Sequence, residues 1–172
     1  MRLSKQTNYA VRTLVYCAVN EPGLSRVSDI ARTYAISEMF LFKIILPVAK
    51  NGLLETVRGR RGGVRLARPA DEINLGDVLR ITEESFALSE CMEHEPEACP
   101  LRGHCLYTQA LDRALTAFLD VIGEYTIADL ARNARTLEAV LGISKLEKRP
   151  SAIRWGGRLG SVAMRLRTGD TD

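Results

Sequence analysis

Apolar residues recur at helical spacing over the first third of the chain and predict three consecutive helices. The first begins near Lys5, where Ser4 can cap it, and ends before Pro22. A short second helix over 27–34 and a longer third helix over 37–51 follow it. Paired helices joined by a short turn, with another helix beside them, are typical of a DNA-binding helix-turn-helix unit.

The pattern changes after the third helix. Two β-prone runs, 53–57 and 64–67, flank the glycine-rich turn at 58–63 and predict a two-stranded hairpin. Three helices followed by a two-stranded ribbon are the element order of a winged helix-turn-helix. We therefore expect a mainly α fold with a small β-hairpin wing.

The second half of the chain has a different organisation. A helix over 75–82 is followed by a polar, acidic segment, 85–105, that has the composition of a loop. A long helix over 107–124 carries apolar residues at intervals of three and four, and one or two short helical pieces fit 127–141. Glycine, proline and scattered arginine predict a disordered basic tail over 145–172.

Charge is distributed unevenly along the chain, although the net charge is only +3. Residues 1–70 contain 12 lysine and arginine residues against 4 acidic ones, whereas residues 71–144 contain 5 against 14. A basic half joined to an acidic half indicates that the first half binds a polyanion. Because the basic charge coincides with the helix-turn-helix pattern, we expect that polyanion to be double-stranded DNA.

Two classes of protein are disfavoured by the same sequence. No run approaches the roughly 18 consecutive apolar residues that a membrane span needs. Asn8 and Arg12 interrupt the apolar residues behind the basic start, so a signal-peptide core is missing, and we expect a cytoplasmic protein with no membrane partner. The absence of a glycine-rich nucleotide-binding motif and of a catalytic triad arrangement argues against an enzyme.

The predicted DNA contacts come from the third helix and the hairpin. The third helix can lie in the major groove, and its N-terminal part would present Ser37, Glu38, Met39, Phe40 and Lys43. The hairpin would bring to phosphates or to a narrow minor groove the arginines Arg58, Arg60, Arg61 and Arg65. Arginine suits this role because it supplies charge and a planar donor fork. The alternative is an ordinary hairpin whose arginines are only solvated.

Three of the four cysteines fall in the predicted loop. Cys91, Cys99 and Cys105 have the spacing C-x7-C-x5-C, whereas Cys17 lies among apolar residues of the first helix, as a small buried hydrophobe would. Three cysteines cannot pair off completely, and a disulfide is disfavoured in the cytosol. The three thiols therefore indicate a metal centre.

Two kinds of metal centre fit these thiols. An iron–sulfur cluster can be wrapped by cysteines spread over a flexible loop, because its iron corners lie further apart than the ligands of a single ion. A zinc site commonly uses a short pair of cysteines, which the loop lacks, although His94 and His104 could complete one. An electron-transfer or redox enzyme that uses the cluster is a further alternative, but the second half is small for a substrate pocket.

Three segments together resemble a known family. They are the start MRLSKQTNYAVRTL, the run SEMFLFKIILPVAKNGLLETVRGRRGGVRLA and the cysteine loop. They are similar to the iron–sulfur winged-helix regulators, which include the cluster-assembly regulator IscR and the nitric-oxide sensor NsrR. The FLFKI run and the TEESFA stretch before the first loop cysteine look most like the iron-responsive, RirA-type members. The resemblance covers roughly residues 1–144.

The resemblance implies a cofactor and an assembly. Cys91, Cys99 and Cys105 would be ligands of an iron–sulfur cluster, of the 4Fe–4S type or alternatively of the 2Fe–2S type. The long helix over 107–124 would cross with its copy in a homodimer, which fits an apolar stripe that one small domain cannot cover.

A division of the chain follows from these implications. The expected parts are a winged helix-turn-helix domain (1–83), a cluster-binding loop (84–106), a dimerisation helix with short C-terminal helices (107–144) and the basic tail (145–172).

Two positions depart from the family's pattern. IscR-like members have a histidine three residues after the last cysteine, where this chain has Thr108. NsrR-like members use an aspartate near the N-terminus, reached across the dimer, where this chain has the uncharged Asn8. A fourth iron therefore lacks an obvious protein ligand, and the candidates are Asn8, His94, His104, Glu93, Glu95 and solvent.

Together these features predict a DNA-binding repressor of iron-responsive genes that loses its cluster and its operator affinity when iron is low. A repressor that senses nitric oxide or redox state on the same scaffold is the alternative, because an exposed cluster reacts with nitric oxide and with oxygen.

Overall fold

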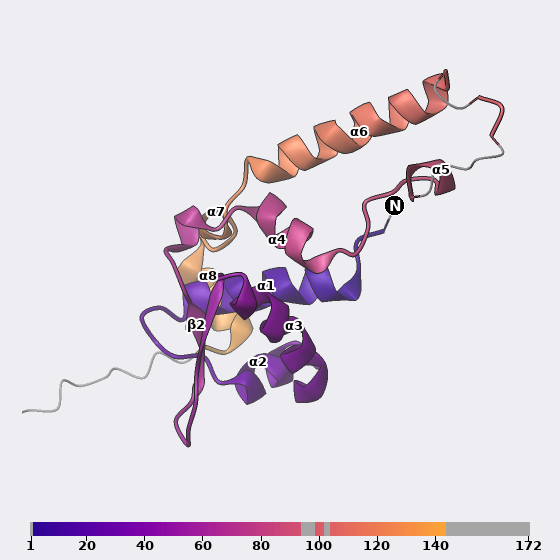
Figure 1. Cartoon of the computed structure of the whole chain (residues 1–172). Helices are drawn as coiled ribbons and strands as arrows, with labels where there is room; N and C mark the ends of the chain where they lie inside the picture. Colours follow the sequence, from indigo (N-terminus) through magenta and orange to yellow (C-terminus); the bar gives the residue numbers. More distant parts are fainter. Residues whose placement is uncertain (1, 94–98, 102–103, 144–172) are drawn as a thin grey trace, which may run out of the picture.

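The structure is a computed structural model that describes residues 2–93, 99–101 and 104–143. Helices predominate among these residues, with one two-stranded hairpin beside them (Figure 1). Along the chain the elements are α1 (Lys5–Val19), α2 (Val27–Thr33), α3 (Glu38–Lys50), β1 (Leu54–Val57), β2 (Gly63–Leu66), η1 (Ala70–Glu72), α4 (Leu75–Thr82), α5 (Glu90–Glu93), α6 (Leu106–Gly123), α7 (Ile127–Leu130) and α8 (Ala134–Leu141).

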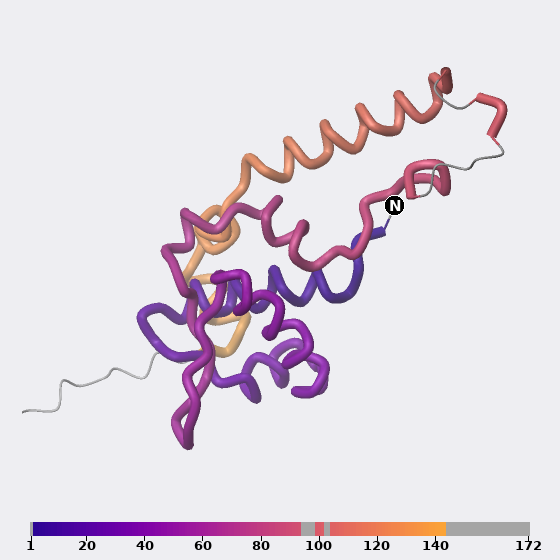
Figure 2. Tube along the Cα trace, viewed as in Figure 1, coloured from indigo at the N-terminus to yellow at the C-terminus, as the bar shows by residue number. Residues whose placement is uncertain are grey.

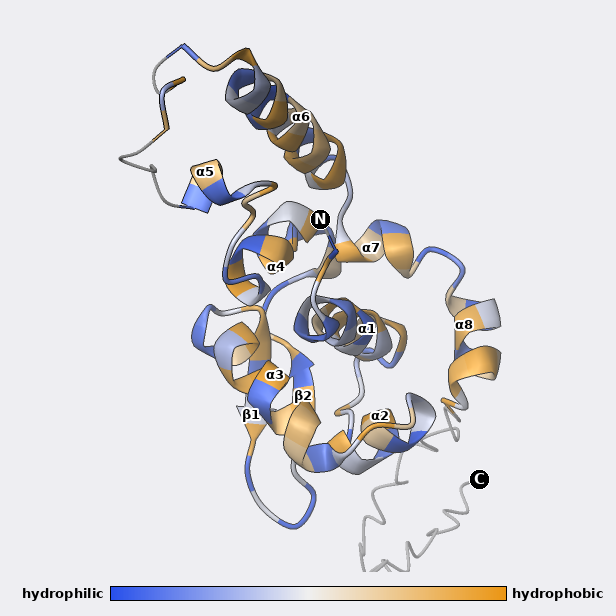
Figure 3. Cartoon of the chain, turned by 90° about the vertical axis from the view of Figure 1, so that its right-hand side faces the viewer, coloured by the Kyte–Doolittle hydropathy of each residue, from blue (hydrophilic) through white to orange (hydrophobic). Residues whose placement is uncertain are grey.

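The first helix, α1, lies in the middle of the folded body (Figure 3). Ser4 begins it, because the side-chain oxygen accepts a hydrogen bond from the backbone N–H of Thr7. Contacts reach α1 from α3, β2, α4, α7 and α8. Ala10 and Leu14 are completely buried, so α1 forms the centre of the apolar core.

The helix-turn-helix unit consists of α2 and α3. Between them Ala35 has a φ of 52°, in the left-handed region that few residues other than glycine adopt, and the chain reverses there within a few residues. Ser37 caps α3 by accepting a hydrogen bond of 3.2 Å from the backbone N–H of Phe40. The helix packs on α1 and α2 through one buried face, which consists of Leu41, Ile44, Ile45 and Val48.

The wing is the antiparallel hairpin of β1 and β2, in which Leu54 lies opposite Leu66. Ser25, just before α2, pairs with Val64 through two backbone hydrogen bonds of 2.8 and 2.9 Å. A Cβ atom at Gly63 would lie 2.4 Å from the carbonyl oxygen of Ser25, so this close approach requires glycine. The base of the wing is therefore held against the helix-turn-helix unit.

The beginning of α4 is tied to the end of α6. Asn74 caps α4 by accepting a hydrogen bond from the N–H of Gly76, and its side-chain amide donates to the carbonyl of Gly123. The backbone N–H of Leu75 donates to the carbonyl of Tyr125 at 2.9 Å. From this tie α6 extends away from the folded body (Figures 1 and 2).

The segment after α6 returns to the body. Thr126 and Asp129 form a capping box that begins α7. Ile127 is completely buried and joins the core around α1, together with Leu141 and Ile143 near the end of the described chain. The apolar core is therefore built from both ends of the described chain.

The predicted mainly α fold with a hairpin wing is confirmed, and the bounds of the predicted elements agree with the structure to about one residue. The segment predicted as a loop differs, because it contains the short helix α5. The division at residues 83, 106 and 144 stays a prediction, although 127–143 shares a core with the first 83 residues. The basic tail lies outside the described residues. None of the described helices is long and apolar enough to cross a lipid bilayer.

The role of α1 in the core can be tested by replacing leucine with alanine at one buried and one exposed position. Leu14→Ala removes a completely buried side chain, and we expect it to lower the free energy of unfolding by about 2–5 kcal/mol. Leu46→Ala removes the same atoms from a side chain that is 73% exposed, and we expect a change below about 0.5 kcal/mol. Urea unfolding followed by circular dichroism measures both. Equal losses in the two variants would contradict the described core.

Candidate nucleic-acid interface and metal centre

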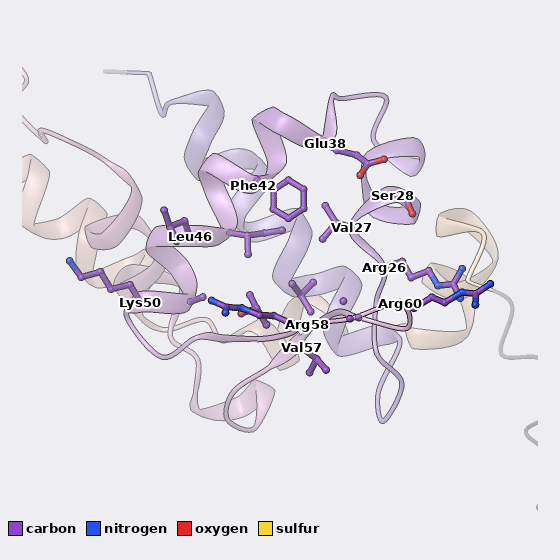
Figure 4. A pocket seen from close by; sticks show the side chains of 17 residues that line it. Arg26, Val27, Ser28, Glu38, Phe42, Leu46, Lys50, Val57, Arg58 and Arg60 are labelled. Atoms are coloured by element: carbon purple, nitrogen blue, oxygen red, sulfur yellow. The ribbon is translucent and has the colours of Figure 1, made fainter.

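A groove of about 1110 Å³ lies between α3, the start of α2 and the wing (Figure 4). Phe42 and Leu46 stand on its α3 side, and Val57 stands on its wing side. All three side chains are at least one-third exposed, so apolar surface is open to solvent in this groove. The groove therefore combines the two elements that were predicted to contact DNA.

Basic side chains surround this groove. Arg26, Lys50, Arg58 and Arg60 line it, and Glu38 is the single acidic residue among the described residues that do so. The excess of positive charge is suited to the phosphates of a nucleic acid.

The four predicted wing arginines differ in their partners. Arg65 lies on β2 and forms an ion pair of 2.8 Å with Glu55 on β1. The hydrogen bond from Arg65 lowers the pKa of the Glu55 carboxyl and raises that of the guanidinium. Arg58, Arg60 and Arg61 form no ion pair with any described residue and are exposed at the turn of the wing. These three arginines are therefore free to meet phosphates.

The structure separates the predicted α3 residues into two groups. Glu38, Met39 and Lys43 are exposed, and Ser37 is exposed while it caps the helix. Phe40 is half-buried and packs edge-to-face on Tyr9 of α1, with ring centroids 5.8 Å apart. Its role in DNA contact stays a prediction, and this packing gives Phe40 a structural role between α1 and α3.

The groove is also lined by four residues that were not among the predicted DNA contacts: Arg26, Phe42, Leu46 and Lys50. Helical spacing could have identified two of them, because Phe42 and Leu46 follow Met39 by three and seven residues and so share its face of α3. Arg26 could not be found in this way. It precedes α2, and the pairing of its neighbour Ser25 with Val64 of the wing brings it to the groove.

The loop cysteines lie in the connection between α4 and α6. Cys91 belongs to α5, and Cys105 immediately precedes α6. The Oγ1 atom of Thr108 in the first turn of α6 lies 3.5 Å from the Sγ atom of Cys91. Cys105 is the N-cap residue of α6, three residues before Thr108. Thr108 therefore lies beside two of the three loop cysteines.

The same hydrogen bonds change the acidity of the two thiols. The Ser89 hydroxyl, 3.1 Å from the Sγ atom of Cys91, lowers the pKa of that thiol, and Thr108 lowers it further. Thr108 also lowers the pKa of Cys105. Metals bind cysteine as the thiolate, so these surroundings fit metal ligands.

The third loop cysteine and the histidine candidates are placed differently. Cys99 is free and half-buried in the same connection, between segments 94–98 and 102–103, which lie outside the described residues. His104 is exposed, and His94 is not among the described residues. Within the part of the chain that the structure describes, no group of three or more His, Cys, Asp or Glu side chains is placed to hold one metal ion.

The other candidate for a fourth ligand, Asn8, is exposed on the first turns of α1. Its side-chain amide donates a hydrogen bond of 3.0 Å to the carbonyl of Ser4. Its role as a ligand stays a prediction, as does that of His104.

The end of α4, where the cysteine connection begins, is fastened to the start of α1. The Oε1 atom of Glu83 accepts a hydrogen bond of 2.8 Å from the backbone N–H of Ser4 and another from the hydroxyl of Thr7. The hydroxyls of Thr7 and Thr82 are 2.7 Å apart and buried. The cysteine connection therefore starts from a point that is fixed to the central helix.

Cys17 has a different environment from the three loop cysteines. It is 1% exposed on α1, and burial raises the pKa of its thiol to about 12. A buried neutral thiol is not prepared to bind a metal. The structure therefore confirms the prediction that Cys17 is a buried core residue.

The unpaired wing arginines lead to a prediction on DNA binding. We expect Arg60→Ala to weaken binding to a random-sequence duplex and to lower the slope of log affinity against log salt by about one for each wing in contact. Arg65→Ala should have a smaller effect, because Glu55 already engages this guanidinium. Salt titrations by fluorescence anisotropy measure both slopes. Arg135→Ala on α8, outside the groove, is the control, and an equal loss in that variant would contradict the assignment.

The contrast among the cysteines leads to a second prediction. In metal-free native protein at about pH 8, iodoacetamide should modify Cys91, Cys99 and Cys105, because these thiols are only half-buried. Cys17 should react only after denaturation, because it is buried and almost entirely protonated at that pH. Peptide mass mapping reports each site. Rapid native modification of Cys17 would contradict its placement in the core.

Comparisons with known proteins agree with this geometry. The model of the Rrf2 family, described as an iron-dependent transcriptional regulator, matches residues 3–133. Protein aau3 of Rhizobium meliloti (strain 1021) is 54% identical over 145 residues, which cover 84% of this chain and 94% of that protein. The HTH-type transcriptional regulator NsrR of Halalkalibacterium halodurans is 42% identical over 142 residues, which cover 82% of this chain and 97% of the relative.

A solved structure supports the same conclusion. The oxidized form of Staphylococcus aureus CymR superposes with a TM-score of 0.61 at 29% identity, and the match covers 76% of this chain and 96% of that one. The resemblance seen in the sequence is thereby confirmed at the level of the family. The chain belongs to the Rrf2 family and is a DNA-binding transcriptional regulator rather than an enzyme.

Proposed function

We propose that this regulator is a homodimeric repressor of iron-responsive genes, and that it binds its operator when an iron–sulfur cluster is held by Cys91, Cys99 and Cys105. The observation that carries the proposal is the arrangement of Cys91 and Cys105 around the hydroxyl of Thr108. The description of the family as iron-dependent supports the choice of iron over zinc.

The donor set fits a cluster of the 4Fe–4S type, and the 2Fe–2S type is the alternative. A bound cluster supplies a cross-link among three thiolates and a metal content that responds to iron, oxygen and nitric oxide. Thr108 lies beside two of these thiols and favours their ionised forms. A fourth position without a strong protein ligand, with Asn8, His94 or His104 as candidates, would ease the loss of one iron when iron is scarce.

The cysteine connection controls the direction of α6 in this proposal. The start of α4 is hydrogen-bonded to the end of α6 through Asn74 and Gly123. The end of α4 leads into the cysteines, and these lead into the start of α6 (Figure 2). Three thiolates held together would therefore fasten the start of α6, whose other end is already held by Asn74.

The direction of α6 matters because this helix is the candidate dimer contact. None of its described residues is buried, and Leu106, Tyr107 and Val121 are more than half exposed. Figure 3 colours much of its length as hydrophobic. A second copy would cover this surface. Tight operator binding then requires the two α3 helices to be spaced by about 34 Å, one turn of DNA.

A second route leads from the connection to the DNA-binding face. Glu83 and Thr82 join the end of α4 to the start of α1 through Ser4 and Thr7. Packing of Tyr9 on α1 against Phe40 then joins α1 to α3. A change of order in the connection could therefore reach α3 within one protomer.

A nitric-oxide-sensing repressor is the second candidate function. It is favoured by the relatives named NsrR, among which the Oceanobacillus iheyensis protein is 38% identical and the Halalkalibacterium halodurans protein 42% identical. The three cysteines would hold the cluster in the same way, and the two functions differ in the chemical that removes it. In either case we place the protein in the cytoplasm, where operator DNA is found.

The proposal is tested by native mass spectrometry of protein purified without oxygen. We expect a dimer with iron and sulfide on each chain, and we expect Cys91→Ser and Cys105→Ser to lose both, because each removes a ligand. Cys17→Ala is the matched control and should keep the cluster, because this cysteine is buried away from the connection. One zinc per chain, or no metal after reconstitution, would contradict the proposal that an iron–sulfur cluster controls operator binding.

Linkage supplies the functional part of the same test. If the cluster-bound form binds the operator better, the operator must raise the equilibrium affinity for the cluster by the same factor. A chelator titration should therefore need more chelator when operator is present. Equal operator affinity with and without the cluster, at fixed salt, would contradict the proposal. Loss of the cluster to nitric oxide but not to the chelator would select the second candidate function.

A further inference from the structure

An apolar stripe on α3 is exposed to solvent. Met39, Phe42 and Leu46 are 74%, 54% and 73% exposed, although all three side chains are apolar. Their spacing of three and four residues places them on one face of the helix. The core does not need this face, because α3 already packs through its buried residues. The stripe therefore has no partner within the described part of this chain.

The surroundings of the stripe indicate what covers it. Phe42 and Leu46 line the groove beside the wing, together with four basic side chains and the single acidic Glu38 (Figure 4). Lys43 is exposed on the next position of the same helix. An apolar strip inside a basic groove fits a polyanion that also offers apolar groups at its surface, and it disfavours a basic peptide.

The polar groups of α3 are few. Arginine and lysine read guanine, and asparagine and glutamine read adenine, by paired hydrogen bonds. Of these four kinds of side chain, α3 contains only lysine. Glu38, Lys43 and Lys50 are its only charged residues. The major groove of DNA presents one apolar group to a protein, the C5-methyl group of thymine. The side chains of the stripe match this group.

We propose that Met39, Phe42 and Leu46 read thymine methyl groups in the major groove, so that apolar contact specifies the part of the operator beneath α3. The proposal rests on DNA binding by this family, and it does not depend on the iron–sulfur cluster. The position of α6 agrees with it. In Figure 1 α6 and the wing lie on opposite sides of the body, so a second copy on α6 would leave the groove open to DNA.

The first part of the test compares bases that differ by one methyl group. The full chain, both iron-loaded and metal-free, selects its tightest duplex from a random-sequence library. We expect thymines opposite α3 in each half-site. Replacing each of them by uracil removes only the methyl group and should weaken binding about fourfold per contacted methyl, which corresponds to about 0.8 kcal/mol. At the same positions 5-methylcytosine should bind more tightly than cytosine by a similar factor.

The second part assigns the effect to the stripe. Phe42→Ala and Leu46→Ala should each bind the thymine and uracil duplexes almost equally at the positions that the missing side chain contacts, because the apolar group that meets those methyl groups is gone. Val140→Ala on α8 is the control, since Val140 is also apolar and 74% exposed, and it should keep the difference. Circular dichroism and the mass of the oligomer show that the variants fold and assemble.

Three outcomes would overturn the proposal. They are equal affinity of the unmodified protein for thymine and uracil at every position, an equal loss on both duplexes in Phe42→Ala, and a selected duplex without thymine opposite α3. The first of these needs no variant, so misfolding of a variant cannot hide it. Equal affinity of the iron-loaded and metal-free forms for the selected duplex would contradict control by the iron–sulfur cluster. It would not bear on the reading of thymine by α3.

Discussion

The burial of α1 is the constraint on which the other elements depend. Leu14 and Ala10 are completely buried, and α3, β2, α4, α7 and α8 all pack around this helix. Apolar surface removed from water is the main source of stability in a domain of this size. One common core therefore positions α3, the base of the wing and α4, because each of them packs against α1.

This arrangement places the two candidate sites at different parts of the molecule. The groove lies where α3 meets the wing, and the cysteine connection lies between α4 and α6. Hydrogen bonds from Ser4 and Thr7 to Glu83 hold the start of α1 against the last turn before the connection. The tie between Asn74 and Gly123 holds the other end of α4 against α6. Both ends of α4 are therefore held, and the start of α6 is joined to α4 through the cysteine connection.

The apolar surfaces of α3 and α6 are both exposed, and their surroundings distinguish their partners. The stripe on α3 lies in a groove lined by four basic residues, which is suited to DNA. The stripe on α6 belongs to the acidic half of the chain, and a second copy can cover it through an apolar contact between identical helices. Exposed apolar surface of this kind is costly in water unless a partner covers it, so both stripes point to assembly.

The sequence by itself was enough to predict the helices and the wing. It also showed the separation of basic and acidic residues and the cluster of three cysteines in one loop. Helical spacing, the caps at Ser4, Ser37 and Asn74, and the glycine-rich turn are local signals, because each depends on residues a few positions apart. The tertiary structure alone decided which of these residues meet. Arg26 reaches the groove because its neighbour Ser25 pairs with Val64 of the wing, Phe40 packs on Tyr9 of α1, and Thr108 lies 3.5 Å from Cys91. Such contacts join residues that are distant in the chain, and no local pattern records them.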